Sequence, residues 1–255
     1  MGLPTPGTNK LQVLRAIEDG WQAFCRAPWP FLLFQVLVLV VMAPFAALLA
    51  GGLMRLNSPE LAFVHPIAAG IAAVVGLVGY VVVALWGAVG LTRGAWISLE
   101  GQRPSFRQFT RWDRAASGRL LGSAVLLAIV VAVVAVLATL ISGGLGRLNG
   151  TLTVIPVILF GVFYVWFLIT QKFLLQLSLL GSNKPLDTLR AGVQGVNPSW
   201  WVVLWLAIVE SVLHAIAVLF SWGGLFVVVP VMICISTAAY RQLFGSQDHT
   251  GLLRL

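Results

Sequence analysis

A seven-residue phrase occurs twice in this chain, as G-G-L-M-R-L-N at 51–57 and G-G-L-G-R-L-N at 143–149, with six of seven positions identical. A weaker echo, G-G-L-F, begins at Gly223. Each copy lies between two long apolar stretches. Because a repeated connection between paired apolar stretches is typical of tandem supersecondary units, the pattern predicts three helical hairpins in a row.

Composition places these hairpins in a membrane. Of 255 residues, 59% are apolar and only 9% are charged, too few to cover a water-soluble domain. A membrane-crossing helix needs about 20 apolar residues and pairs all its backbone groups internally. Six apolar runs meet this length, at 30–50, 66–98, 120–141, 152–180, 199–220 and 225–243. The sequence therefore predicts an all-α, polytopic transmembrane bundle that forms one membrane domain over 1–255.

The distribution of basic residues predicts the orientation. Fourteen of the 16 Lys and Arg residues lie before the first run, in or beside 93–119 and 172–190, or after the last run; only Arg55 and Arg147 fall on the other side. Since Lys and Arg accumulate on the cytoplasmic side, both termini are predicted to be cytoplasmic. The basic residues do not form a dense stripe, so the sequence predicts no nucleic-acid partner.

The repeat extends beyond the glycine phrase. A gap-free shift of 92 residues carries the first phrase onto the second and Leu14 onto Phe106. A shift of 172 residues carries Leu14 onto Leu186 and Trp29 onto Trp201. Each predicted unit contains an interfacial helix and a transmembrane hairpin, so all units share one orientation about an axis near the membrane normal. The unit boundaries are approximately 8–103, 104–183 and 184–245.

Each unit begins with a short amphipathic segment. Apolar residues recur there every three or four positions, as on one face of a helix: Leu11, Leu14, Ile17, Trp21 and Phe24; Phe106, Phe109, Trp112 and Ala116; Leu186, Leu189, Val193 and Val196. Ser105 is a predicted N-cap, and Arg107, Arg111 and Arg114 lie opposite or beside the aromatic face, as in a helix within the headgroup layer. These arginines are candidate contacts for lipid or a partner. The alternative is that all three segments are linkers packed under the bundle.

The glycine phrase has a structural and a functional interpretation. Adjacent glycines after a span can adopt positive φ at a helix C-terminus and let a second helix start close to the first. The recurrence of Arg55 as Arg147 is explained either by shared ancestry of the units or by an external phosphate or partner contact.

Two ionisable residues lie inside the fifth apolar run. Glu210 and His214 are four positions apart, on one face of a helix, where they could form a hydrogen bond or an ion pair. Ionisable groups at membrane depth are costly and are functional candidates by default. We interpret them as a candidate proton-linked site, with Gln35 and Ser211 as polar neighbours. The alternative is that Glu210 is protonated or paired and ties helices together.

Catalytic motifs are missing from the sequence. It contains no H-E-x-x-H, G-x-S-x-G or phosphate-binding G-x-x-x-x-G-K pattern, and its three His residues are far apart in sequence. The sequence therefore predicts no catalytic residue, no metal site and no cofactor, and gives no support for an enzyme.

Four stretches carry a resemblance to a known family. They are G-W-Q-A-F-C-R-A-P-W-P-F at 20–31, S-F-R-Q-F at 105–109, A-G-V-Q-G-V-N-P-S-W-W at 191–201 and A-A-Y-R-Q-L-F-G at 238–245. The chain resembles an uncharacterised bacterial family of six-span membrane proteins. That family is similar to the membrane domain fused to glycerophosphodiester phosphodiesterases. The resemblance implies a six-span fold over nearly the whole chain. It also implies a bacterial cytoplasmic membrane as the location, with another internal membrane such as a thylakoid as the alternative. It implies no hydrolase activity, because the catalytic barrel of those enzymes has no counterpart here.

These observations together predict a non-catalytic polytopic membrane protein. It would act as an envelope component or as an accessory subunit of a membrane complex, with membrane lipids and other membrane subunits as partners. The competing hypothesis is a small transporter or permease component that uses Glu210 and His214. A polar cavity reaching Glu210 would favour transport, whereas a filled centre with an exposed apolar flank would favour a subunit.

Overall fold

The structure is a computed structural model that describes residues 11–57, 66–147, 149–181, 184–219 and 222–253. Within these ranges all regular structure is helical. The helices are α1 (Val13–Arg26), α2 (Pro28–Asn57), α4 (Pro66–Leu99), α5 (Phe106–Thr110), α6 (Arg114–Gly146), α7 (Val154–Thr170), α8 (Leu174–Gln176), α9 (Pro185–Val196), α10 (Trp200–Leu219) and α11 (Trp222–Phe244). Short helical turns at Gly150–Thr153, Leu177–Gly181 and Asn197–Ser199 connect some of them.

Six helical segments are long and apolar enough to cross a membrane. They are Pro28–Asn57, Pro66–Leu99, Arg114–Gly146, Gly150–Thr170, Pro185–Leu219 and Phe226–Phe244. The all-α class and the six predicted spans are therefore confirmed at the level of length and composition. The side of the membrane on which the termini lie stays a prediction.

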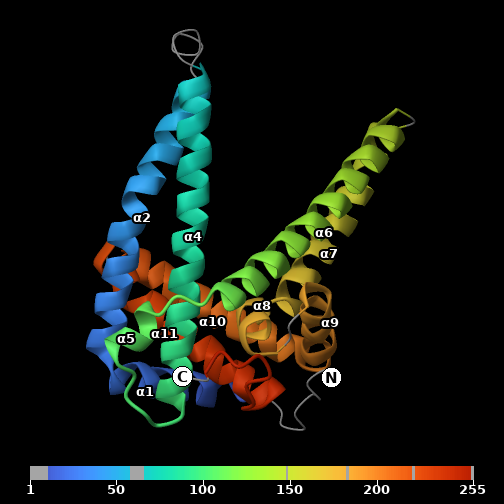
Figure 1. Ribbon diagram of the computed structural model, residues 1–255. Coiled ribbons are helices and arrows are strands. Elements are labelled where there is room, and N and C mark those ends of the chain that lie inside the picture. The colour runs from blue at the N-terminus through green and yellow to red at the C-terminus, as the bar shows by residue number, and fades with distance from the viewer. Residues whose placement is uncertain (1–10, 58–65, 148, 182–183, 220–221, 254–255) are drawn as a thin grey trace.

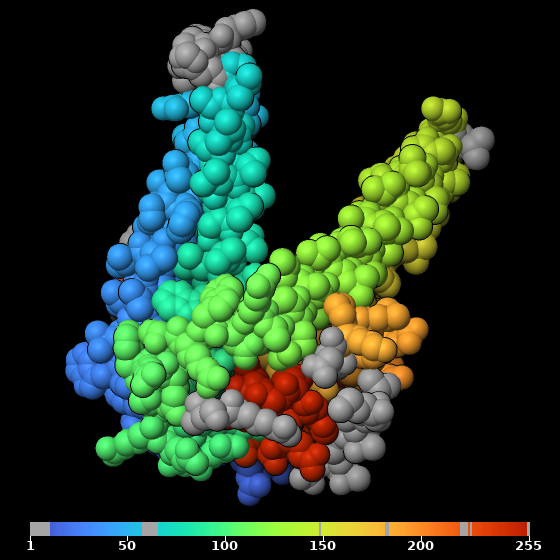
Figure 2. Space-filling model, in the orientation of Figure 1, coloured from blue at the N-terminus to red at the C-terminus, as the bar shows by residue number. Residues whose placement is uncertain are grey.

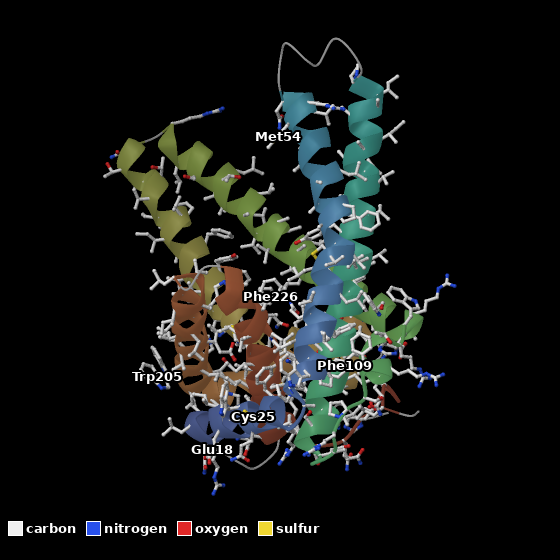
Figure 3. All side chains as sticks on the ribbon, turned by 90° about the vertical axis from the view of Figure 1, so that its left-hand side faces the viewer. Glu18, Cys25, Met54, Phe109, Trp205 and Phe226 are labelled. Atoms are coloured by element: carbon white, nitrogen blue, oxygen red, sulfur yellow. The ribbon has the colours of Figure 1, made fainter. Side chains whose placement is uncertain are left out.

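The six long helices form three antiparallel hairpins, α2–α4, α6–α7 and α10–α11, which meet at a common base (Figure 1). The first two hairpins project as separate arms, and side chains do not fill the space between their outer parts (Figure 2). The third hairpin stays beside the base and does not reach the tips of the other two (Figure 3). The equivalent disposition of three tandem units about one axis remains a prediction.

The first hairpin packs closely because glycines remove side chains between its helices. A methyl group on Gly76 would stand 2.4 Å from the backbone nitrogen of Leu49, and one on Gly52 would stand 2.6 Å from that of Ala73. Neither approach leaves room for a Cβ atom. The helices therefore contact each other through backbone, as small residues permit in membrane helix pairs.

The base of the molecule contains the core. There α1 packs across α11, and a methyl group on Gly20 would stand 2.6 Å from the Cα of Ile235. Trp96 of α4 is fully buried against Tyr240 of α11, with ring centroids 6.3 Å apart. The first helix, the first hairpin and the last helix thus share one packed unit.

The glycine phrase does not form the predicted turn. The adjacent glycines of both copies lie inside helices, which continue to Asn57 in α2 and to Gly146 in α6. Positive φ occurs instead at Gly101, Gly245 and Gly251 among the described residues. A helix accepts glycine in its interior at a cost of about 1 kcal/mol per residue, so adjacent glycines do not by themselves end it. Leu148, within the second copy, lies outside the described residues.

The second amphipathic segment is not one continuous helix. As predicted, Ser105 is the N-cap of α5, and its backbone N–H donates to Oε1 of Gln108 at 2.7 Å. The helix ends at Thr110, and a new helix begins after Asp113, whose carboxylate accepts a 2.9 Å hydrogen bond from the backbone N–H of Ala116. This cap starts α6 in a new direction, so Ala116 belongs to a different helix from Phe109.

The helix formed by the fourth apolar run also ends earlier than predicted. Regular α7 stops at Thr170 rather than continuing to 180. The next residue, Gln171, turns its side-chain amide toward α9, where it donates to the carbonyl of Leu189 at 3.0 Å. After Gln171 the chain enters the base, where Phe173, Leu177, Leu179 and Leu180 are buried.

Candidate functional site

Glu210 on α10 is the centre of a buried polar cluster. Its side chain is only 3% exposed. One carboxylate oxygen, Oε1, accepts a 2.8 Å hydrogen bond from the hydroxyl of Ser236 on α11. The other, Oε2, is paired with the ammonium group of Lys172, just after the end of α7. The cluster therefore joins the second hairpin to both helices of the third.

The structure does not bring the other predicted members to Glu210. His214 lies one turn further along α10, but its side chain is exposed, and no hydrogen bond links it to Glu210 within the described ranges. Ser211 is also exposed and donates to the carbonyl of Ala207 in its own helix at 2.8 Å. Gln35 is buried on α2 and does not bond Glu210. The helical spacing placed Glu210 and His214 near one another, but their side chains have different environments.

Sequence reasoning did not select Lys172 or Ser236. Lys172 stands among the charges that indicated topology, and Ser236 lies in an otherwise apolar run. One signal in the sequence could have identified them: each is a polar residue beside or within a predicted span, where polar side chains need a hydrogen-bond or ion-pair partner. Which partner each one finds depends on helix packing across 38 and 26 residues of sequence.

The cluster around Glu210 is suited to holding helices together. Both carboxylate oxygens have a donor, and the Lys172 side chain is 21% exposed. A buried ion pair of this kind offsets the cost of desolvation only while both partners remain in place. None of the three pockets described below has Glu210 among its lining residues.

A second ionic cluster holds the connection between the first and second hairpins. Arg93 of α4 has a side chain that is 2% exposed, and its guanidinium lies 3.5 Å from the carboxylate of Asp113. The same guanidinium donates to the backbone carbonyls of Gln108 and Arg111 at 3.1 and 3.0 Å. Arg93 thus binds the C-terminal end of α5 and the cap of α6. The sequence indicated only its contribution to topology.

The predicted lipid-contacting arginines are separated by the break between α5 and α6. Arg107 and Arg111 line a pocket of about 520 Å³ together with Ser105, Gln108 and Thr110. Arg114 is also exposed, but it begins α6 and does not line this pocket.

The two arginines of the glycine phrase lie far from these clusters. Arg55 is in the last turn of α2, and Arg147 is the C-cap of α6, so both are exposed at the distal ends of separate hairpins. Figure 1 shows these ends widely separated. A single site that uses both arginines in one molecule is not formed.

Two further pockets have different chemistry. One, of about 530 Å³, lies between α1, α4 and α11, and its charged lining residues are Asp19, Arg26 and Arg241. The Arg241 guanidinium also stacks over the Trp96 ring at 4.9 Å from its centroid. The other, of about 390 Å³, has an apolar lining within the α6–α7 hairpin. In the part of the chain that the structure describes, no three His, Cys, Asp or Glu side chains gather as metal ligands.

Comparisons with known proteins add no functional information to this geometry. No protein-family model, curated protein or solved structure matches the chain. By length and composition, the six long apolar helices are those of a multi-pass α-helical membrane protein.

Proposed function

We propose that this chain is a non-catalytic membrane protein that serves as an envelope component or an accessory subunit of a membrane complex. The observation that carries the proposal is the uncovered apolar surface of the α6–α7 hairpin. Leu140 on α6 and Val162 on α7 are 67% and 65% exposed, and no residue of the most apolar 18-residue stretch of α6 is buried. Lipid and a partner protein are the two environments that accept such a surface.

The polar clusters support the same proposal. Glu210 and Arg93 are both buried and paired, so each is engaged in joining helices. The resemblance to the bacterial six-span family, the three tandem units and a cytoplasmic position of both termini are parts of the proposal. We place the protein in a bacterial cytoplasmic membrane because of this resemblance, and we place its termini on the cytoplasmic side because the basic residues gather on one side of the predicted topology.

The proposal is tested by photocrosslinking in native membranes. A photoreactive amino acid is placed at Val162 on α7, and the matched control is the same substitution at Ile208, which is 44% exposed on α10. We expect a discrete protein adduct from Val162 and its identification by mass spectrometry after purification. If both positions yield only lipid adducts, the accessory-subunit proposal is wrong.

The competing proposal, a small transporter, is favoured by one observation. Glu210 is an acidic residue within a membrane-spanning segment, and such residues mark ion or substrate pathways in many transporters. Proton flux into liposomes that contain the purified protein tests this function. Flux that the Glu210→Gln variant abolishes, with the protein still folded, would establish transport and replace the subunit proposal.

A further inference from the structure

The short helix α5 is held rigidly against the first hairpin. Phe109 is fully buried, and its ring centroid lies 4.9 Å from that of Phe31 and 5.5 Å from that of Phe34 on α2. On α4, a methyl group added to Gly94 would stand 2.1 Å from the Phe109 ring. The aromatic ring therefore fixes α5 in a slot where α4 has no side chain.

The internal contacts of α5 and its C-terminal end leave the Arg107 and Arg111 side chains uncommitted. Arg93 and the indole N–H of Trp86 donate to backbone carbonyls of the segment, with Trp86 bonding that of Thr110 at 3.0 Å. In contrast, the guanidinium groups of Arg107 and Arg111 have no acceptor within the described ranges, and both side chains are exposed. Two fixed points of the backbone thus present two free cationic groups.

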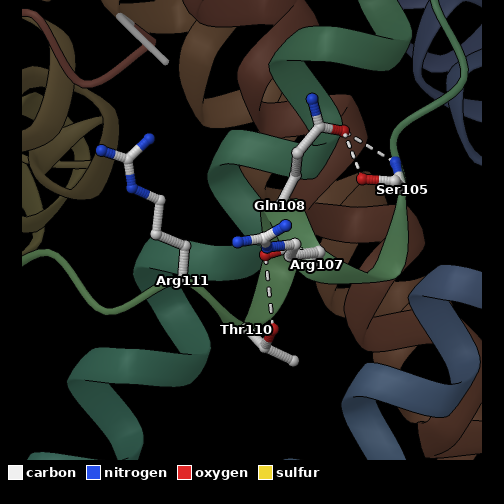
Figure 4. A pocket seen from close by; sticks show the side chains of 5 residues that line it. All are labelled: Ser105, Arg107, Gln108, Thr110 and Arg111. Carbon is white, nitrogen blue, oxygen red and sulfur yellow. Dashed lines mark hydrogen bonds between the residues drawn. The ribbon is translucent and has the colours of Figure 1, made fainter.

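Arg107 and Arg111 line the same pocket, of about 520 Å³ (Figure 4). Ser105, Gln108 and Thr110 complete the lining. The Ser105 hydroxyl donates to Oε1 of Gln108 at 3.2 Å, and the Thr110 hydroxyl donates to the backbone carbonyl of Arg107 at 3.3 Å, so the arginines are the free donors of the pocket. Guanidinium groups form paired, charge-assisted hydrogen bonds with phosphate oxygens. The chemistry of the pocket is therefore that of a phosphate site.

The length of α4 places this pocket near the membrane surface. The helix has 34 residues, and about 20 of them cross the hydrocarbon layer. The surplus belongs at the end near Leu99, because Arg93, Glu100 and Arg103 gather there. Since α5 packs beside Gly90 and Gly94, it lies at the level of this surplus.

Exposed aromatic groups flank the arginines. Phe106 is 40% exposed and Trp112 is 47% exposed, although both are large and apolar. Aromatic side chains next to cationic ones are typical of a surface in contact with the membrane interface, where rings meet the acyl chains and cations meet the headgroups. A soluble anion would make use of the arginines alone.

We propose that this pocket binds the phosphate group of an anionic phospholipid. The inference deepens the proposed function, on which the membrane position rests, by naming a specific lipid class and its site. Arg107 and Arg111 bind the phosphate oxygens, and Phe106 contacts the adjoining acyl chain.

The test is a lipid titration of the full-length protein, purified in mild detergent and followed by native mass spectrometry. Phosphatidylglycerol is the anionic probe and phosphatidylcholine is the zwitterionic comparison. The Arg107→Gln/Arg111→Gln variant is expected to weaken phosphatidylglycerol binding by about 10-fold, because it removes two charge-assisted contacts. The matched control is Arg103→Gln/Arg114→Gln, which removes two exposed arginines of the same region that do not line the pocket. We expect its effect to stay below about 2-fold.

The outcomes separate a defined site from general attraction. Equal losses in the two double variants would overturn the proposal in favour of diffuse electrostatic binding, and no loss in the pocket variant would also overturn it. The Arg107→Lys/Arg111→Lys variant keeps the charge and is expected to give an intermediate affinity, since lysine lacks the planar donor fork. Thermal unfolding of each variant checks that the fold is retained.

A second arm distinguishes a lipid from a free anion. Excess inorganic phosphate is added before the lipid, and we expect phosphatidylglycerol to remain bound because its acyl chains contribute to affinity. Complete displacement by phosphate would show a soluble-anion site and overturn the lipid assignment. This experiment uses purified protein without a partner, so its failure is distinguishable from a failure of the photocrosslinking test.

Discussion

The hairpins α6–α7 and α10–α11 differ both in how apolar they are and in how much of them is buried. Helix α6 contains the most apolar 18-residue stretch of the six spans, and none of that stretch is buried in the protein. Helix α11 contains the least apolar one, and half of it is buried. A side chain that faces lipid must be apolar, whereas one that faces another helix can be polar when it has a hydrogen-bond partner there. Ser236 is such a residue, since it bonds Glu210 from inside the third hairpin.

This comparison shows that hydropathy and burial are separate properties in a membrane protein. High hydropathy indicates the membrane, but it marks the lipid-facing surface as readily as the protein core. The less apolar helices form the packed base, and the more apolar hairpin extends away from it. A partner protein is therefore more easily accommodated on α6–α7 than on α11.

The largest difference between the hairpins is expected for leucine truncation. Leu206→Ala on α10 removes a fully buried side chain and should lower the free energy of unfolding by about 2–5 kcal/mol, because a cavity remains. Leu140→Ala on α6 removes a side chain that is 67% exposed and should change it by less than about 0.5 kcal/mol. Unfolding in mixed micelles with increasing dodecyl sulfate measures both. Similar losses would show that α6 is packed in solution.

The next effect concerns the ion pair between the hairpins. Glu210→Gln and Lys172→Met should each lower the free energy of unfolding by about 2–3 kcal/mol, since each leaves its buried partner without a full counter-charge. The double variant should lose about 1–3 kcal/mol less than the sum of the single losses. The same unfolding titration supplies all the values of the cycle. Strict additivity would contradict a direct interaction.

A smaller effect is expected from glycine substitutions that compare the two projecting arms. Gly76→Ala places a methyl group 2.4 Å from the backbone of Leu49, so it should separate α2 from α4 and cost about 1–2 kcal/mol. Gly161→Ala on α7 meets nothing within 4 Å and should be neutral or stabilising by up to about 1 kcal/mol. Thermal unfolding in detergent distinguishes them. Equal destabilisation would mean that α7 is covered by protein.

The smallest effect on stability is expected from thiol labelling, which tests directly whether the base is packed. Cys25 near the end of α1 is exposed, and Cys234 inside α11 is fully buried. We expect a maleimide to modify Cys25 in the folded protein and Cys234 only after denaturation, as counted by mass spectrometry. The Cys25→Ser variant should remain unmodified until unfolding. An impermeant maleimide added to either side of sealed vesicles also reports the side on which Cys25 lies.

Much of the fold could be predicted because its determinants are local. Run length and the need for internal backbone pairing indicated the six spans, and Ser105 marked a helix start. The prediction of a turn at the adjacent glycines was wrong because glycine is also compatible with a helix interior. The break after Thr110 was missed because the apolar spacing continues across it. Only the N-cap at Asp113 marks the start of a new helix.

The candidate sites were predictable in their residue types rather than their partners. Spacing along one helix suggested that Glu210 pairs with His214, but the structure supplies Lys172 and Ser236 from other helices. Arg107 and Arg111 were identified as basic residues beside an aromatic face. Their common pocket exists only because Phe109 and Arg93 fix the short helix that carries them.

The sequence by itself determined an all-helical chain with six spans, because hydrophobicity and backbone hydrogen bonding act within each segment. It also determined the supply of ionisable groups beside and inside the spans. Only the tertiary structure decided that α6 would be uncovered, that Glu210 would bind Lys172, and that two arginines would share one pocket. Those outcomes depend on which helices pack together, and packing is selected by contacts between residues far apart in the chain.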